Sequence, residues 1–193
     1  MKKLIGLNKV KTAVFISGNG SNLKNLIKFS RKKNSPISIN LIISNSLRAK
    51  GLKYSKRYKI KKKIIDLDNK KLEKKFLTFL YKNDIKFICL AGYMKILSKN
   101  FIRNFKGKII NIHPSLLPKY KGLNTHKKVI ENNEKYSGCT VHYVTKKLDS
   151  GKIILQQKVK LSKNDTPISL AKKVLKKEHL IYPKAIKIIF PNS

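Results

Sequence analysis

The sequence is short of acidic residues, of cysteine and of long apolar runs. Its 193 residues include nine Asp and Glu against 46 Lys and Arg, two cysteines and no tryptophan. No stretch approaches the roughly 20 consecutive apolar residues that a membrane-spanning helix needs, which excludes an integral membrane protein of that kind. Cys89 and Cys139 are too few for a disulfide scaffold and too far apart in sequence for a metal-ligand pair. A chain of this length predicts one domain, residues 1–193, around a single core.

The start of the chain also lacks the features of a secretion signal. Lysines stand near the N-terminus, but the apolar stretch that follows is interrupted by Asn8, Lys9 and Lys11, and no small-residue cleavage site comes after it. Together with the low cysteine content, this predicts a protein that stays in the reducing cytoplasm.

Arginine is scarce within a strongly basic composition. The formal net charge is +37, yet only Arg31, Arg48, Arg57 and Arg103 carry the planar side chain that suits base readout. The lysines are spread along the whole chain, and Ile and Asn are abundant too, a combination typical of an AT-rich coding sequence. We therefore favour compositional bias over dedicated nucleic-acid binding. A basic, noncatalytic nucleic-acid-binding protein is the alternative from a different functional class.

The pattern of apolar residues predicts an α/β fold. Short runs rich in β-branched residues alternate with lysine-rich segments of helical period, which is typical of a mainly parallel sheet flanked by helices. Two alternating segments across an LDSG turn then predict an antiparallel hairpin, followed by a terminal helix with Thr166 as its N-cap and an interruption near Pro183. We expect strands at 12–17, 37–44, 62–67, 85–92, 107–114, 137–144 and 152–161, and helices at 21–33, 46–58, 70–83 and 166–190.

The segment SGNGSNL, residues 17–23, joins the first predicted strand to the first predicted helix. Gly18 and Gly20 permit backbone conformations closed to other residues, and Ser21 and Asn22 lie where the N–H groups of a helix are unpaired. This pattern predicts an anion cradle that suits a phosphate. The segment lacks the third glycine of a dinucleotide-binding turn and the lysine of a P-loop, so neither NAD nor ATP binding follows. A plain glycine turn with a Ser/Asn cap is the alternative.

Asn111 and His113 stand at the end of the buried strand predicted at 107–114. Residues two apart in a strand face the same side, so the amide and the imidazole point together. Such a pair suits a carbonyl whose oxygen gains negative charge during a reaction. Asp149, in the hairpin turn, supplies a carboxylate that would orient the imidazole and raise its pKa. Taken singly, each residue has an ordinary alternative, as a strand-end Asn, a loop-capping His or a turn Asp.

The remaining histidines and acidic residues give weaker signals. His126 is expected in a loop or at a helix start, and His142 is expected to alternate outward on its strand. Glu178 is one of only nine acidic residues, and it lies among lysines on the last helix beside His179. No two histidines have metal-ligand spacing on a helix, and the cysteines add no ligands, so no metal site is predicted.

Five segments, in this order, resemble those of the phosphoribosylglycinamide formyltransferases. They are SGNGSNL, LAGYMKIL, INIHPSLLPKYKGLNTH, VHYV with LDSGKIILQ, and EHLIYP, and they run from about Val14 to Pro183. HPSLLP with a downstream LDxG is specific to folate-dependent formyl transfer in general, whereas SGNGSNL at the first turn points to the glycinamide ribonucleotide branch. The resemblance implies a Rossmann-like sheet extended by a C-terminal antiparallel hairpin and a terminal helix, in agreement with the element order above.

The resemblance also implies a reaction and the residues that carry it. The family transfers the formyl group of 10-formyltetrahydrofolate, a co-substrate, to the amino group of glycinamide ribonucleotide in purine (IMP) synthesis, with no metal. By resemblance, Asn111, His113 and Asp149 are the catalytic trio. The implied substrate-binding residues are Gly20, Ser21, Asn22 and Glu178. The implied folate-binding residues are Met94, Lys95, Ile96, Leu97, Val144, Thr145 and Leu148.

Three positions depart from the usual family pattern. Lys95 stands in place of an arginine, Lys121 in place of a proline, and Asn124 where a histidine is common. The nearest alternatives in the wider group are another folate-dependent formyltransferase, such as methionyl-tRNA formyltransferase, and 10-formyltetrahydrofolate hydrolase. Both normally carry a further domain, for which we expect this chain to have no room. The implied partners are small-molecule substrates rather than a specific nucleic acid or a membrane, and both a monomer and a homodimer stay open.

Overall fold

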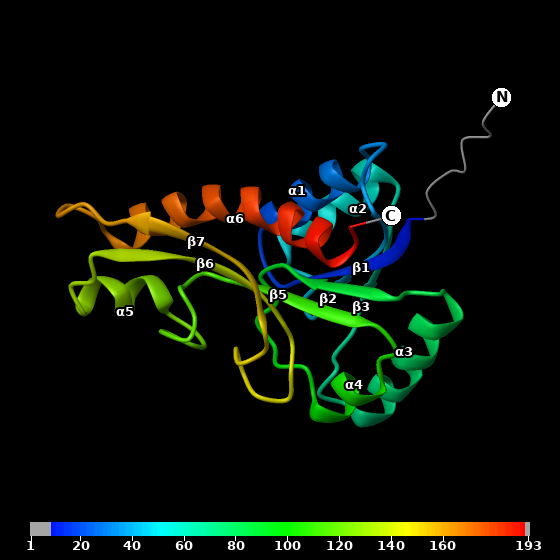
Figure 1. Ribbon diagram of the computed structural model, residues 1–193. Helices are drawn as coiled ribbons and strands as arrows, with labels where there is room; N and C mark the ends of the chain where they lie inside the picture. Colours follow the sequence, from blue (N-terminus) through cyan, green and yellow to red (C-terminus); the bar gives the residue numbers. More distant parts are fainter. Residues whose placement is uncertain (1–8, 192–193) are drawn as a thin grey trace.

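A computed structural model describes residues 9–191 of the chain. Residues 1–8, where the absence of a secretion signal was predicted, and residues 192–193, at the end of the predicted 1–193 domain, lie outside the described residues. The described chain forms a seven-stranded sheet of order β3-β2-β1-β4-β5-β6-β7 (Figure 1). The first five strands run parallel, and β6 and β7 are antiparallel to their neighbours. The strands are β1 (Val10–Ile16), β2 (Ile37–Ser44), β3 (Lys61–Ile64), β4 (Phe87–Leu90), β5 (Lys108–His113), β6 (Tyr136–Tyr143) and β7 (Ile153–Lys160).

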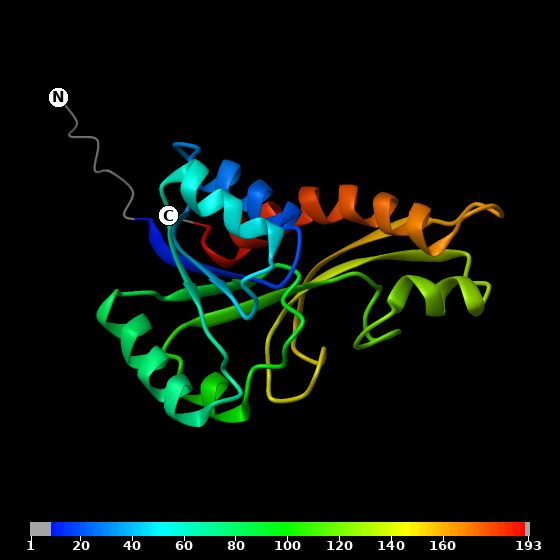
Figure 2. The same ribbon diagram turned by 180° about the vertical axis from the view of Figure 1, so that it is seen from behind.

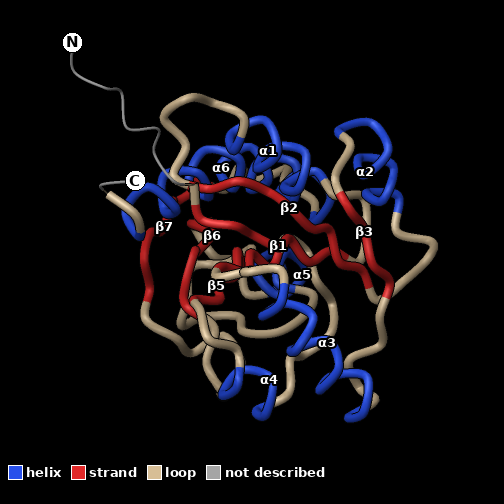
Figure 3. The backbone as a smooth tube through the Cα atoms, turned by 90° about the vertical axis from the view of Figure 1, so that its right-hand side faces the viewer, coloured by secondary structure: helices blue, strands red, loops and turns tan. Residues whose placement is uncertain are grey.

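Helices cover both faces of the sheet. In Figure 3, α1 and α6 lie on one side of the strands, and α3 and α4 lie on the other; Figure 2 gives the same arrangement from behind. The helices are α1 (Ser21–Ser30), α2 (Lys53–Tyr58), α3 (Lys70–Lys82), α4 (Lys99–Asn104), α5 (Thr125–Glu131) and α6 (Pro167–Ile189), with a 3₁₀ turn, η1, at Lys50–Leu52.

The two apolar layers follow from the alternation of side chains along the strands. On β1, Val14 and Ile16 pack in the cluster beneath α1 and α6, whereas Ala13 and Phe15 pack in the cluster beneath α3 and α4. All four side chains are fully buried, as expected for a central strand covered on both faces. The α/β sheet, the hairpin and the terminal helix are thus as predicted, with β2 at its predicted bounds and the ends of the other strands shifted by one to three residues.

The helix predicted at 46–58 is much shorter in the structure. Only η1 and α2 form, from residue 50 onward. Before them, the Ser44 hydroxyl accepts a hydrogen bond from the Ser46 N–H, and the Ser46 hydroxyl accepts one from the Arg48 N–H. Such bonds between residues two apart are typical of turns closed by serine side chains, and the segment before residue 50 is a turn rather than a helix.

The predicted interruption near Pro183 is wrong, because α6 is one helix of 23 residues with Pro183 inside it. Proline has no N–H for the carbonyl four residues earlier, which here belongs to His179. The side chain of Asn25, on the neighbouring helix α1, donates to that carbonyl at 2.7 Å. The bond that proline removes is therefore replaced from another element, and the helix continues.

We expect Asn25→Ala to lower the free energy of unfolding by about 1–3 kcal/mol, because it leaves the His179 carbonyl without its donor. In a Pro183→Ala background the helix regains an N–H for that carbonyl, so Asn25→Ala should then cost less than half as much. Urea unfolding of the four proteins measures this coupling. Equal costs of Asn25→Ala in both backgrounds would contradict the explanation.

Candidate active site

The candidate site lies at the carboxyl edge of the three neighbouring strands β1, β4 and β5. The loops that follow β1 and β4 are joined by two hydrogen bonds: the Ser17 N–H donates to the Gly92 carbonyl at 3.0 Å, and the Met94 N–H donates to the Ser17 hydroxyl at 2.8 Å. Carboxyl ends of parallel strands share one edge, and this is where open α/β sheets place their ligands. The predicted phosphate cradle and the predicted folate segment are therefore neighbours.

Asn111, His113 and Asp149 come together at this edge. Asn111 and His113 lie on β5, and Asp149 lies in the turn between β6 and β7. One carboxylate oxygen of Asp149 is 3.4 Å from His113 Nδ1 and accepts a hydrogen bond from the Gly122 N–H at 2.9 Å. His113 is 5% exposed and Asp149 9% exposed, so their interaction takes place largely away from bulk water. Two stretches about 35 residues apart in sequence thus converge on one site.

Both ring nitrogens of His113 face acceptors. Nδ1 faces Asp149, and Nε2 is 2.8 Å from the carbonyl oxygen of Tyr120. Burial lowers the pKa of His113 below its ordinary value, against the opposing effects of the Tyr120 carbonyl and Asp149. The ring is thus held neutral by burial, while its two neighbours are arranged to receive the hydrogens of a doubly protonated ring.

Asp149 is the charged member of the group. Burial raises the pKa of its carboxyl, but the hydrogen bond with His142, the Gly122 N–H and the two histidines together lower that pKa below its ordinary value. Asp149 itself has a left-handed backbone, with φ of 45°, a conformation that Asp and Asn adopt more readily than most residues. The turn therefore presents a carboxylate that is ionised at neutral pH.

His142 belongs to the same cluster, although it was expected to point outward. It is only 2% exposed, and its Nε2 lies 3.3 Å from Asn111 Nδ2 and 3.6 Å from the second oxygen of Asp149. Its Nδ1 lies 2.9 Å from the carbonyl of Tyr143. The expectation failed because β6 is covered on both faces, so no side of it faces water at this point. The sequence signal for the burial of His142 was its position within an alternating segment of apolar residues.

The loop between β5 and α5 contains two of the unusual positions, Lys121 and Asn124, and is tied to the Asp149 turn at the first of them. Lys121 donates from its ammonium to the Ser150 hydroxyl at 2.6 Å, next to the bond from Gly122 to Asp149. Asn124 precedes α5 with a left-handed φ of 58° and makes no side-chain cap. Asparagine adopts that conformation more readily than most residues, which explains an asparagine at this position.

The turn at residues 17–23, predicted to be an anion cradle, places a left-handed glycine directly before a helix. Helix α1 begins at Ser21, and Gly20 before it has a left-handed φ of 71°. A Cβ on Gly20 would come within 2.7 Å of the Gly51 Cα, so both the dihedral and the space require glycine. A Cβ on Gly18 meets no atom within 4 Å. The conformational requirement predicted for both glycines therefore holds for Gly20, while Gly18 has room for a side chain.

Glu178 of α6 lies beside this cradle. Its carboxylate accepts a hydrogen bond from Asn22 Nδ2 at 2.6 Å, and burial raises the pKa of Glu178 above its ordinary value despite that bond. The Asn22 side-chain oxygen and His179 Nε2 are buried without a hydrogen-bond partner among the described residues. Unpartnered buried polar atoms are costly, so the unpartnered oxygen of Asn22, in the predicted cradle, indicates a place for a polar ligand.

The residues expected to contact a folate lie in two segments, one after β4 and one after β6, where the Val144 N–H donates to the Ile109 carbonyl near the start of β5. Met94 and Ile96 are exposed, at 61% and 71%, and Leu148 is half exposed in the hairpin turn. Leu97 is buried and packs, with Val144, on the apolar cluster beneath α3 and α4. The Lys95 ammonium pairs with Asp68, and the Thr145 hydroxyl donates to the Lys147 carbonyl. Exposed apolar side chains here supply surface for a flat heterocycle, whereas the Leu97 side chain faces the core.

Within residues 9–191, no group of three or more His, Cys, Asp or Glu side chains is arranged to hold a metal ion. Among the described helices, none is both long and apolar enough to cross a membrane.

Comparison with known proteins places the chain in a family. Residues 10–186 match the formyl transferase domain family. The phosphoribosylglycinamide formyltransferase of Haemophilus influenzae is 39% identical over 181 residues, which cover 92% of this chain and 85% of that protein. The chain belongs to the phosphoribosylglycinamide formyltransferase family. The predicted family and the predicted fold are therefore confirmed.

Solved structures of the phosphoribosylglycinamide formyltransferase family have the same fold. The crystal structure of the enzyme from Anaplasma phagocytophilum superposes with a TM-score of 0.87 at 41% identity, covering 94% of this chain and 87% of that one. That from Brucella melitensis gives 0.88 at 37% identity, covering 96% and 97%. The trifunctional purine biosynthetic protein adenosine-3 of Gallus gallus is 41% identical over 189 residues. This chain spans 19% of that trifunctional protein's length.

We expect the protein to lose stability as the pH falls from 7 to 5. Burial lowers the pKa of His113, His126 and His179 from the ordinary value of 6.5. Such a histidine binds more protons in the unfolded chain than in the folded protein. Its contribution to the free energy of unfolding is therefore complete above pH 6.5 and is lost as the pH falls toward the pKa of the folded state. Urea unfolding across this range measures the slope. His126→Gln should make the slope of the free energy of unfolding against pH shallower. An unchanged slope would show that His126 does not contribute to this pH dependence.

Proposed function

We propose that the chain transfers the formyl group of 10-formyltetrahydrofolate to the amino group of glycinamide ribonucleotide, giving formylglycinamide ribonucleotide and tetrahydrofolate in purine synthesis. The observation that carries this proposal is the convergence of Asn111, His113 and Asp149 at the same carboxyl edge of the sheet as the Gly20 turn, within a chain of this family. A folate-type formyl donor agrees with membership of the formyl transferase family.

In the proposed reaction, the amine attacks the formyl carbon and the formyl oxygen becomes negatively charged. Asn111 Nδ2 and a ring N–H of His113 stabilise that oxygen, and each such donor is worth about 3–4 kcal/mol. The Tyr120 carbonyl oxygen now lies at hydrogen-bond distance from His113 Nε2. In the proposed complex the formyl oxygen replaces the Tyr120 carbonyl as the acceptor for His113 Nε2. The loop between β5 and α5 must therefore move away from His113 by about the length of one hydrogen bond.

Asp149 has two roles in this mechanism. Its carboxylate opposes the effect of burial on His113 and so favours the ring that carries hydrogens on both nitrogens when negative charge develops nearby. Through water, it also helps to carry the proton from the attacking amine to the departing folate nitrogen. His142 holds the second carboxylate oxygen and contacts the amide of Asn111, so it keeps the two functional groups aligned.

The nucleotide substrate is positioned by the cradle and by α6. The phosphate binds at Gly20, Ser21 and Asn22, where the first turn of α1 has free N–H groups and a favourable dipole. Glu178 accepts hydrogen bonds from the ribose hydroxyls, and the unpartnered Asn22 oxygen supplies a further acceptor.

The folate binds along the two groups of residues near the strand edge. Met94, Ile96 and Leu148 offer apolar surface to the pteridine, and the backbone of residues 144–149 offers polar groups. The proposed mechanism uses no metal, and we place the reaction in the cytoplasm. A monomer and a homodimer both satisfy it, since every group named above comes from one chain.

An acceptor comparison tests this function. The purified protein is mixed with 10-formyltetrahydrofolate and with glycinamide ribonucleotide, with methionyl-tRNA or with no acceptor, and tetrahydrofolate release is followed. We expect rapid release only with glycinamide ribonucleotide. Release without an acceptor would indicate a hydrolase, and formylation of the tRNA would indicate the other transferase; either result would overturn the proposal.

A further inference from the structure

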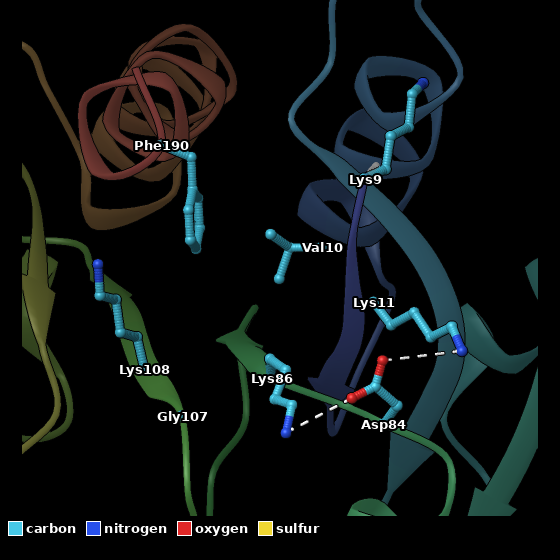
Figure 4. Close-up of a pocket in the computed structure, with 8 residues that line it drawn as sticks. All are labelled: Lys9, Val10, Lys11, Asp84, Lys86, Gly107, Lys108 and Phe190. Carbon is cyan, nitrogen blue, oxygen red and sulfur yellow. Dashed lines mark ion pairs between the residues drawn. The ribbon is translucent and has the colours of Figure 1, made fainter. Parts of the chain in front are cut away.

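A hollow opens at the amino edge of the sheet, opposite the candidate active site. Its volume is about 570 Å³, and its lining comes from the starts of β1 and β5, the segment before β4 and the end of α6. Lys108 begins β5 and His113 ends it, so the hollow and the catalytic trio are about 17 Å apart along that strand. Figure 4 shows the lining residues Lys9, Val10, Lys11, Asp84, Lys86, Gly107, Lys108 and Phe190.

The hollow is more basic than the chain as a whole. Lysine supplies four of its eight lining residues, whereas Lys and Arg together supply 46 of the 193 residues. Asp84 is the single acidic residue of the lining, and its carboxylate oxygens lie 3.4 Å from Lys86 Nζ and 3.9 Å from Lys11 Nζ. One carboxylate thus gathers two ammonium groups on one side of the hollow without neutralising both, and the lining keeps an excess of positive charge.

The opposite side of the hollow is aromatic. The Phe190 ring projects between Lys108 and Val10 in Figure 4 and is fixed by an edge-on contact with Phe87 at 5.0 Å between centroids. Lys108 Nζ lies 5.1 Å from the Phe190 ring centroid. Within residues 9–191, Lys108 has no carboxylate partner. An ammonium group and an apolar ring are therefore presented side by side.

We propose that this hollow binds a nucleoside polyphosphate, with its phosphates at Lys11, Lys86 and Lys108 and its base against Phe190. The volume lies within the range of about 300–1,000 Å³ found for small-molecule sites. Lysine ammonium groups bind phosphate as point charges, and an aromatic wall adds contact with the flat base. This site is separate from the Gly20 cradle, which lies at the other edge of the sheet.

Calorimetric titration with ATP at 150 mM NaCl tests the site, because at that salt the field of distant surface lysines is screened beyond about 8 Å. We expect the double variant Lys86→Gln, Lys108→Gln to raise the Kd for ATP at least tenfold. The matched control is Lys62→Gln, Lys75→Gln, which removes the same charge from exposed positions of β3 and α3. It should change the Kd less than twofold. Equal weakening by both pairs would show general attraction to a basic surface and overturn the proposal.

A variant that is expected to bind ATP more tightly distinguishes an effect on this site from a general loss of structure. Asp84 is exposed and has a left-handed φ of 55°, a conformation that asparagine accepts. Asp84→Asn frees Lys11 and Lys86 and removes the negative charge, so the Kd for ATP should fall severalfold. An unchanged or higher Kd would count against the assigned position of the phosphates.

Two further probes test the ligand class. ATP should bind more tightly than inorganic tripolyphosphate, because only ATP has a base for Phe190, and adenosine should bind far more weakly than either. Equal affinity for ATP and tripolyphosphate would show that the base makes no contact, and would assign the hollow to an inorganic polyphosphate instead of a nucleotide. A single-stranded oligonucleotide that binds more tightly than ATP and loses affinity in the Lys86→Gln, Lys108→Gln protein would assign the hollow to nucleic acid instead.

Discussion

Asp149→Asn is expected to lower kcat at least about 100-fold, which corresponds to about 2.7 kcal/mol of transition-state stabilisation, while KM for glycinamide ribonucleotide changes less than threefold. The substitution keeps the size of the side chain and its left-handed turn, and an amide oxygen still accepts from the Gly122 N–H. It removes the negative charge 3.4 Å from His113 Nδ1. Steady-state kinetics of tetrahydrofolate release measure the effect.

The matched control for this prediction is Asp84→Asn. Asp84 is also a turn aspartate with a left-handed backbone, but it is exposed and lies at the amino edge of the sheet. Its kcat and KM should stay within twofold of the wild-type values. The mechanism uses the doubly protonated ring of His113, whose pKa burial already lowers, so Asp149→Asn should also move the alkaline limb of the kcat profile to lower pH, because the opposing carboxylate is gone. Unchanged kcat in Asp149→Asn would exclude this carboxylate from the chemistry.

Local sequence patterns predicted the seven strands and the longer helices, since these elements carry their own periodicity, whereas the short helices α4 and α5 were not predicted. The nearly apolar run around Phe87–Leu90 indicated a central strand, and the structure buries all four residues in β4. Thr166 and Pro167 indicated the start of the last helix, and Thr166 does accept a hydrogen bond from the Ser169 N–H. The continuity of α6 through Pro183 depends on Asn25, about 155 residues away. Such a contact cannot be recognised from the residues that surround Pro183 in the sequence.

The candidate site was only partly predictable for the same reason. Asn111 and His113 share a strand, so their common orientation follows from a spacing of two. The position of His142 depends on the pairing of β5 with β6, in which Asn111 lies directly opposite His142. That register, and the burial of both faces of β6, are properties of the assembled sheet. The hollow at Phe190 could not be predicted either, because lysines occur throughout this sequence and only the fold brings Lys108 to the Phe190 ring, with Lys11 and Lys86 at the same hollow.

The second large effect is expected at the cradle, where Gly20→Ala should raise KM for glycinamide ribonucleotide at least tenfold. The Cβ would come within 2.7 Å of the Gly51 Cα, and the φ of 71° is strained for alanine. Relief of this contact moves the first turn of α1, whose N–H groups are proposed to hold the phosphate. The free energy of unfolding should also fall by about 1–3 kcal/mol.

Gly18→Ala is the control for the cradle, because a Cβ at Gly18 meets no atom within 4 Å although it lies only two residues away. Its KM and its stability should match those of the wild type. A difference in KM between Gly20→Ala and Gly18→Ala, measured at a temperature where both are folded, separates the geometry of the cradle from a general effect of losing a loop glycine. If both variants raise KM equally, or if neither does, the phosphate does not bind at the left-handed turn that begins α1, and the substrate must be held elsewhere on the carboxyl edge.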